Sequence, residues 1–279
     1  MQWRLRAEAT KFLQPPVTVF GHLLFIAVTT LVLVWLLKFR EGLAFESANK
    51  LKIFNVSSFA LRIPSLSSET VSYLCFYMIC GGPIVLAWIS LLLCLHFNLF
   101  QLPPPSHFQL HPLLMVIGFI LMAGEAIMAY KSTPSRRDIQ VQKAVHLTLQ
   151  TIALGCGIFG IVVIFKFHDE TNMPDMVTLH SWLGMITICL FGLQYLLGFF
   201  SYVFPGAESY SRAAYLPWHT FGGLLIFFLA ICTAEMGLLQ KFLSLFLTRS
   251  QEALIVNFIG LLLFLFAVAV ALTVILPRY

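Results

Sequence analysis

Charged residues are scarce in this sequence. Lys, Arg, Asp and Glu together make up 10% of the 279 residues, whereas hydrophobic residues make up 59%. A soluble globular domain carries about 25% charged residues, so the composition excludes a soluble protein and predicts an integral membrane protein. The formal net charge of +5 is small, and nothing in the sequence indicates binding to nucleic acid.

Cysteine motifs are also missing. The six cysteines form no Cys-x-x-Cys pair, and all of them lie inside apolar runs. Cysteine in such a run usually serves as a small apolar residue. The cysteines therefore indicate neither a metal site nor a redox compartment.

The sequence contains long runs of apolar residues. About 20 apolar residues are needed to cross a bilayer as a helix, and the first such run is too long for the core of a signal peptide. We expect an all-α membrane protein with a six-helix bundle and a four-helix core, preceded by a cytosolic N-terminus at residues 1–16. The six runs cover residues 17–37, 111–130, 144–165, 180–203, 217–239 and 253–275.

The loops between these runs differ in charge. The segment from Lys131 to Lys143 holds four basic residues and one acid, whereas the segment from Phe167 to Leu179 holds three acids and no Lys or Arg. Cytosolic loops of membrane proteins carry an excess of Lys and Arg. We therefore place the first segment in the cytosol and the second on the opposite side of the membrane.

Four histidines stand at or near the start of successive apolar runs. His111, His146, His180 and His219 are separated by 35, 34 and 39 residues, which is about one span of roughly 20 residues plus a loop. His146 and His219 are thus expected near the cytosolic face, and His111 and His180 near the other face. Two pairs of neutral imidazoles that face each other across a helix bundle are what two bis-histidine haems require.

Other roles for these histidines are weaker. A lone histidine in a membrane is often a polar contact, and we expect His22, which lacks the regular placement, to be incidental. Zinc is disfavoured because no cysteine or carboxylate joins the pairs. A proton relay would include buried acids, and Glu125 and Glu235 are the only acids deep in the apolar runs. A non-enzymic membrane scaffold or transporter remains the alternative to an enzyme.

Six motifs occur in order along the chain: HPLLMVIGFILMAGEAIMAYKS, KAVHLTLQ, FKFH, LHSWLG, FPGAESYSRAAYLPWH and TAEMGLLQK. They resemble the cytochrome b561 family in its plant, ascorbate-reducible form, over about residues 17–55 and 111–279, with a core at 111–240. The resemblance implies a usually homodimeric oxidoreductase with two haem b groups in a vacuolar, endomembrane or plasma membrane. Such a protein passes electrons from cytosolic ascorbate to monodehydroascorbate or ferric chelates on the opposite side.

The resemblance also assigns the axial ligands of the two haem irons. His146 and His219 match the ligands of the cytosolic haem. His111 and His180 match those of the haem at the opposite face.

Five further residues match positions at the haem edge and the substrate sites of the family. Lys143 and Arg212, the latter expected in the loop before residue 217, match basic residues that hold cytosolic ascorbate. Lys131 matches a basic residue near the edge of the cytosolic haem. Phe167 and His168, expected in the loop after residue 165, match the pair at the acceptor site.

A block of 54 residues, 56–109, interrupts the resemblance. The family runs from Ile-Phe-Asn almost directly into His-Pro, and removal of the block restores Ile-Phe-Asn-Leu-His-Pro. The block contains an apolar segment from about Val71 to Phe100 that could add a span. Its ends, Val56-Ser57 and Phe108-Gln109, can be encoded by GTAAGT and TTTCAG, which are typical intron ends. We interpret the block as a translated retained intron or an error in the gene model, and a cytochrome disabled by the insertion is the alternative.

This interpretation makes a prediction about the transcript. Sequencing of cDNA across the codons for Asn55 and Leu110 is expected to show a spliced product in which these two codons are adjacent. Peptides from residues 56–109 in the purified protein, together with transcripts that keep the block in every tissue, would contradict it.

Overall fold

The computed structural model describes residues 2–39, 110–132 and 139–276, and the side chains among them except those of residues 2–15, 131 and 132. The block at 56–109, including the apolar segment predicted between Val71 and Phe100, lies outside the described residues.

The described part of the chain is helical apart from its connecting turns. Six of its helices are long and apolar enough to cross a membrane, which confirms the predicted all-α membrane fold with six spans. The elements are α1 (Gln2–Val34), the π-helical η1 (Trp35–Phe39) and η3 (Leu114–Leu121), α6 (Met122–Ser132), α7 (Ile139–Thr171), α8 (Leu179–Tyr202), α9 (Ser209–Ser244) and α10 (Gln251–Ile275).

Two of these helices extend well beyond their apolar runs. α7 continues to Thr171, so Phe167 and His168 lie near its end, and α9 begins at Ser209, so Arg212 lies in its first turn. The expectation that these three residues lie in loops is therefore wrong. An apolar run marks only the part of a helix inside the hydrocarbon, which is about 30 Å thick. The backbone hydrogen bonds continue past that boundary, as from the Arg212 amide to the carbonyl of Glu208 at 2.9 Å.

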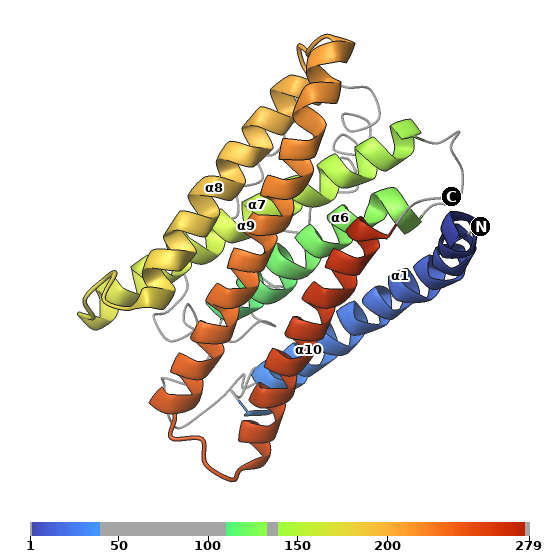
Figure 1. Ribbon diagram of the computed structural model, residues 1–279. Coiled ribbons are helices and arrows are strands. Elements are labelled where there is room, and N and C mark those ends of the chain that lie inside the picture. The colour runs from blue at the N-terminus through green and yellow to red at the C-terminus, as the bar shows by residue number, and fades with distance from the viewer. Residues whose placement is uncertain (1, 40–109, 133–138, 277–279) are drawn as a thin grey trace, which may run out of the picture. The chain divides into compact units, whose positions relative to one another are not determined.

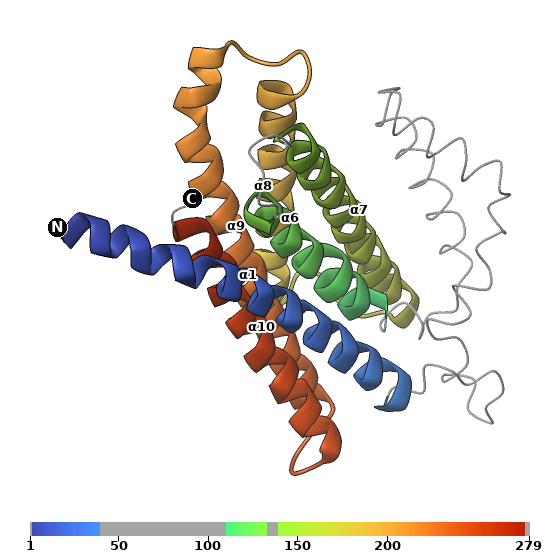
Figure 2. The ribbon, with the colours of Figure 1, turned by 90° about the vertical axis from the view of Figure 1, so that its right-hand side faces the viewer.

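The chain forms two compact units. The first comprises Met1–Trp35, Leu113–Ile158 and Asp175–Tyr279, and the second comprises Leu36–Pro112 and Phe159–Pro174. The first unit thus contains α1, α6, the first half of α7, and α8 to α10. Within it α10 packs against α1, α6 and α9, and α8 packs against α9, an order that can be followed in Figures 1 and 2. In the second unit, Lys166 and Glu170 form an ion pair of 3.5 Å on the last turns of α7.

α10 provides the core of the first unit. Ile259, Leu263, Phe266 and Val270 are completely buried, and their spacing of three and four residues places them on one face of the helix. Gly124 on α6 faces this stripe. A Cβ atom built on Gly124 would lie 2.4 Å from Cε1 of Phe266, so α6 and α10 approach this closely only because the residue is glycine.

The contact predicts the effect of a methyl group at this position. Gly124→Ala is expected to destabilise the bundle by about 1–3 kcal/mol, because Phe266 is fully buried and cannot move without displacing its neighbours. Thermal unfolding in detergent measures the effect. Gly192→Ala on α8 is the control, because its Cβ meets no atom within 4 Å and alanine favours helix by up to about 1 kcal/mol. A melting temperature of Gly124→Ala at or above the wild-type value would contradict this account.

Candidate functional site

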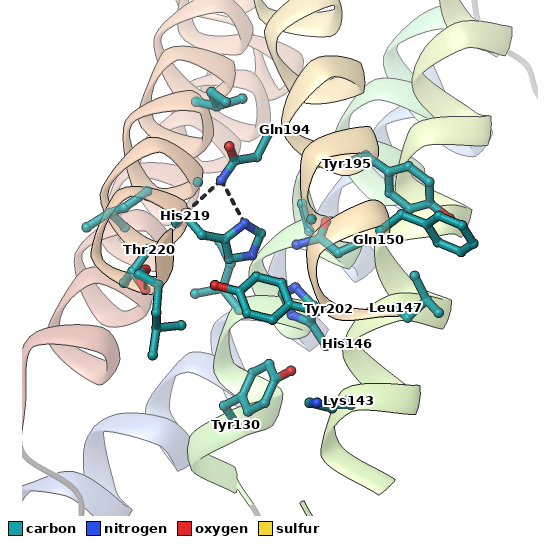
Figure 3. A pocket seen from close by; sticks show the side chains of 18 of the residues that line it. Tyr130, Lys143, His146, Leu147, Gln150, Gln194, Tyr195, Tyr202, His219 and Thr220 are labelled. Carbon is teal, nitrogen blue, oxygen red and sulfur yellow. Dashed lines mark hydrogen bonds between the residues drawn. The ribbon is translucent and has the colours of Figure 1, made fainter. Parts of the chain in front are cut away.

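A cavity of about 600 Å³ lies in the first unit, between α6, α7, α8 and α9. Its volume falls within the range of about 300–1,000 Å³ that is usual for cofactor and ligand sites. Most of the side chains that line it are apolar or aromatic. Its polar residues include Lys143, His146, Gln150, Gln194 and His219, and Figure 3 shows them projecting from the surrounding helices.

His146 from α7 and His219 from α9 meet in this cavity. Their ring centroids are 6.2 Å apart, and the ring planes differ by 68°. Two imidazoles that bind one metal ion from opposite sides, through metal–nitrogen bonds of about 2.0 Å, have centroids about 6.3 Å apart. The separation of the two ring centroids would thus suit one metal ion held between these imidazoles.

A hydrogen bond from Nδ1 fixes the tautomer of His146. This nitrogen lies 2.8 Å from the backbone oxygen of Ala126 on α6. A carbonyl oxygen can only accept, so Nδ1 carries the proton and Nε2 keeps its lone pair free. Metal-binding histidines usually donate their other ring nitrogen in this way, which also orients the ring.

Two more of the predicted ligands use the same device. In the first unit, Nδ1 of His180 donates to the carbonyl of Thr233 on α9 at 2.8 Å. In the second unit, Nδ1 of His111 donates to the carbonyl of Gly160 on α7 at 2.9 Å. In a neutral ring each bond again places the lone pair on Nε2. His180 is also confined by Gly237, at which a Cβ atom would lie 2.7 Å from Cε1 of the imidazole.

His219 is oriented differently, by the side chain of Gln194 on α8. The amide nitrogen of Gln194 donates to the backbone oxygen of His219 at 2.7 Å and lies 3.1 Å from its Nδ1. The backbone oxygen can only accept, so the amide nitrogen must face it; the amide oxygen in that place would set two acceptors 2.7 Å apart. Gln194 thus holds the backbone of His219 and lies against its imidazole.

Aromatic rings surround both imidazoles at the mouth of the cavity. The ring of Tyr130 lies 5.1 Å from that of His146, and the rings of Tyr202 and Tyr215 lie 5.5 and 5.8 Å from that of His219. Such packing holds the two imidazoles in place.

One polar atom in the cavity wall lacks a partner. Oε1 of Gln150 is buried, and it accepts no hydrogen bond from any residue that the structure describes. Buried amide oxygens are almost always paired, so the cavity is complete only with an occupant or water. Two facing imidazoles and apolar walls together fit a haem group.

Two cations line the same cavity, and the other predicted residues lie elsewhere. Lys143 and Arg212 both contribute to the lining, and the Arg212 side chain donates to the hydroxyl of Ser209 at 3.1 Å. Lys131 is in the last turn of α6, and its side chain is not among those described. In the second unit, the rings of Phe167 and His168 lie 6.0 Å apart at the end of α7.

Sequence reasoning missed the amides and tyrosines of this cavity, although some signals were present. Gln150 follows His146 by four residues, and residues at this spacing share a helix face. Gln194 follows His180 by 14 residues, which is about four helical turns. Uncharged amides inside apolar runs commonly mark contacts between helices. The partner of each amide could not be read from the sequence.

Comparisons with known proteins agree with the sequence motifs. The family model described as eukaryotic cytochrome b561 matches residues 110–245, a range that begins where the block at 56–109 has ended. A probable ascorbate-specific transmembrane electron transporter of Oryza sativa is 36% identical over 268 residues, covering 94% of this chain and 90% of the relative. A transmembrane ascorbate ferrireductase of Arabidopsis thaliana is 34% identical over 261 residues, covering 92% and 86%. A transmembrane ascorbate-dependent reductase of Ovis aries is 35% identical over 167 residues, covering 58% and 66%.

The geometry around Gln194 makes a prediction about cofactor retention. Gln194→Leu removes the donor to the backbone of His219 and the amide that lies against its imidazole, and it is expected to weaken haem binding roughly tenfold, the lower end of the effect for such supporting residues. The haem-to-protein ratio and the rate of haem loss to a soluble scavenger measure this. Gln240→Leu, the same change at an exposed position of α9, is the control. Equal haem loss in both variants would contradict the role of Gln194.

Proposed function

This chain belongs to the eukaryotic cytochrome b561 family, and we propose that it transfers electrons across a membrane from cytosolic ascorbate. The route uses two haem b groups and ends on monodehydroascorbate or a ferric chelate at the opposite face. The observation that carries the proposal is the opposed pair His146 and His219, with centroids 6.2 Å apart in a largely apolar cavity. The names of the relatives from Oryza sativa and Arabidopsis thaliana support the choice of ascorbate as donor.

Each haem iron is held by two of the four regularly spaced histidines. His146 and His219 bind the cytosolic haem, and His111 and His180 bind the other. Haem supplies a one-electron carrier whose potential depends on its axial ligands and on burial. The chain contributes imidazoles whose Nε2 atoms are kept unprotonated by bonds from Nδ1 to backbone oxygens, as at His146 and His180. This arrangement supports ligation without any change of protonation at the rings.

Ascorbate is held at the cytosolic mouth of the cavity by Lys143 and Arg212. Ascorbate is a monoanion at neutral pH, and both cations line the cavity that contains His146 and His219. Charge-assisted hydrogen bonds from Lys and Arg place an anion firmly, so the donor is held at the edge of the cofactor cavity. Lys131, one residue beyond the cavity-lining Tyr130, adds to the positive charge at this end.

At the opposite face, Phe167 and His168 form the acceptor site. Both lie near the end of α7, where their rings are 6.0 Å apart. The imidazole of His168 provides a polar contact for an oxygen-rich acceptor, and a second copy of the chain completes a homodimer in the bilayer. These assignments rest on the family resemblance of the FKFH motif.

An optical spectrum of the purified protein tests the proposed function. Addition of ascorbate is expected to produce the α-band of a reduced b-type haem, in a fast phase followed by a slower one. His146→Leu and His219→Leu should each abolish the fast phase, whereas His180→Leu should leave it. A protein without haem absorbance would overturn the proposal and favour a membrane scaffold, a transporter or a cytochrome disabled by its insertion.

The cations at the cavity mouth generate a separate prediction. Lys143→Ala is expected to raise the KM for ascorbate about tenfold with little change in kcat, because a hydrogen bond to a charged group contributes about 1.5–3 kcal/mol. Arg249→Ala, in the turn between α9 and α10, removes a cation from the other end of the bundle and serves as the control. Stopped-flow reduction at several ascorbate concentrations measures both. An unchanged KM for Lys143→Ala would exclude this lysine from the donor site.

A further inference from the structure

His22 forms a close contact that the sequence did not predict. Its Nδ1 lies 3.0 Å from Oε1 and 2.8 Å from Oε2 of Glu125. His22 is on α1 and Glu125 is on α6, and both belong to the first unit. His22, expected to be incidental to the four spaced histidines, is thus one half of an imidazole–carboxylate pair.

The pair lies inside the membrane-spanning part of the bundle. His22 is six residues after Pro16, where the first span begins, and Glu125 is five residues before Tyr130, where the second ends. At 1.5 Å per residue both lie roughly 8 Å within their spans. Ionisable residues at such a depth are rare and costly, and where they occur they commonly bind or relay protons.

The close approach of α1 and α6 at this point depends on the residue next to His22. A Cβ atom built on Gly21 would lie 2.7 Å from the sulfur atom of Met128 on α6. Glycine therefore allows the two helices to touch, which brings the imidazole within reach of the carboxylate. The exposed fraction of the side chain is 40% for His22 and 17% for Glu125. The protein therefore encloses the imidazole less than the carboxylate.

Glu125 of this pair also adjoins the residue whose carbonyl orients His146, a proposed haem ligand. Glu125 immediately precedes Ala126, whose backbone oxygen accepts the hydrogen bond from Nδ1 of His146 at 2.8 Å. One turn of α6 thus carries both the carboxylate and the carbonyl that orients the imidazole. A change of charge at the cavity is therefore felt at the pair through a low-dielectric region.

We propose that His22 and Glu125 form a proton-binding site that takes up one proton when an electron arrives in the His146 and His219 cavity. This inference rests on the proposed function. Ascorbate monoanion gives up one electron and one proton as it becomes monodehydroascorbate. The electron enters the cavity, the proton is released to the cytosolic water, and one proton from that water binds the pair. The pair changes from neutral imidazole and carboxylate to imidazolium and carboxylate, so the added negative charge is balanced.

Few other ionisable groups are near enough to take this role. Among the described side chains, α6 contributes Tyr130, five residues after Glu125, and α7 contributes Lys143 and His146, which line the cavity. The part of α1 within the membrane has no other ionisable residue before Lys38 at its far end. On α10 the only one is Glu252, which accepts a hydrogen bond from Trp35 at 2.9 Å near the end of the first span.

Linkage fixes the direction of the pH effect. If reduction promotes proton binding, then proton binding promotes reduction to the same extent. The midpoint potential of the haem in this cavity must therefore rise as the pH falls.

Redox titrations of the haem-loaded protein at several pH values test the proposal. The wild type is expected to show a midpoint potential that falls as the pH rises, and Glu125→Gln and His22→Gln should each lose most of this dependence. Glu252→Gln, the same change at the other end of the bundle, should retain it. A wild-type slope in both His22→Gln and Glu125→Gln would overturn the proposal.

A second measurement detects the bound proton itself and begins with the wild type. The infrared difference between the reduced and oxidised protein, labelled with 15N-histidine, should contain an imidazolium band that disappears in His22→Gln. A band that persists in this variant would place the proton elsewhere and overturn the proposal. If the variants bind haem that ascorbate reduces, but their midpoint potentials depend on pH as in the wild type, only this inference fails. If no haem is bound, the proposed function fails and the inference fails with it.

Discussion

A histidine inside a membrane depends on a hydrogen bond from the protein, because hydrocarbon offers its ring no partner. In His111, His146 and His180 this bond runs from Nδ1 to a backbone oxygen. A helical carbonyl has a second lone pair beyond the one used by the helix. The bond therefore leaves the helix intact, fixes the ring orientation and directs an unprotonated Nε2 away from the backbone.

The hydrogen-bond acceptors of His146 and His180 lie on neighbouring helices, so the orientation of these rings depends on how the helices pack. The carbonyl for His146 is on α6, although the histidine is on α7, and the carbonyl for His180 is on α9, although the histidine is on α8. His219 takes its support from Gln194 on α8. Rotation of α6 by a single residue would therefore break the support of His146 without moving His146 itself. Close contacts such as that of Gly124 with Phe266 resist this rotation.

The membrane spans and the levels of the histidines could be predicted from spacing along the sequence. Contacts between side chains on different helices could not. Six apolar runs gave six helices, and intervals of about 35 residues placed His146 and His219 at one level, where the structure brings their rings together. Gln194 was missed because its partner is 25 residues away on another helix. Arg212 was assigned to a loop because hydropathy ends where the hydrocarbon ends, whereas the helix continues. The roles of the matched substrate residues came from the resemblance and not from the spacing.

The pair of His22 and Glu125 gives the first helix a part in the proposed proton uptake. The matched family region begins at residue 110 and leaves α1 outside, yet α1 supplies the imidazole that contacts a carboxylate inside that region. The block at 56–109 falls between these two partners in the sequence, whereas all four spaced histidines follow it. A block that altered the placement of α1 would act on the proton-binding pair while the haem ligands stayed in position. The proposed proton uptake thus depends on α1 through His22, whereas the proposed ligation by His146 and His219 depends on α7 and α9.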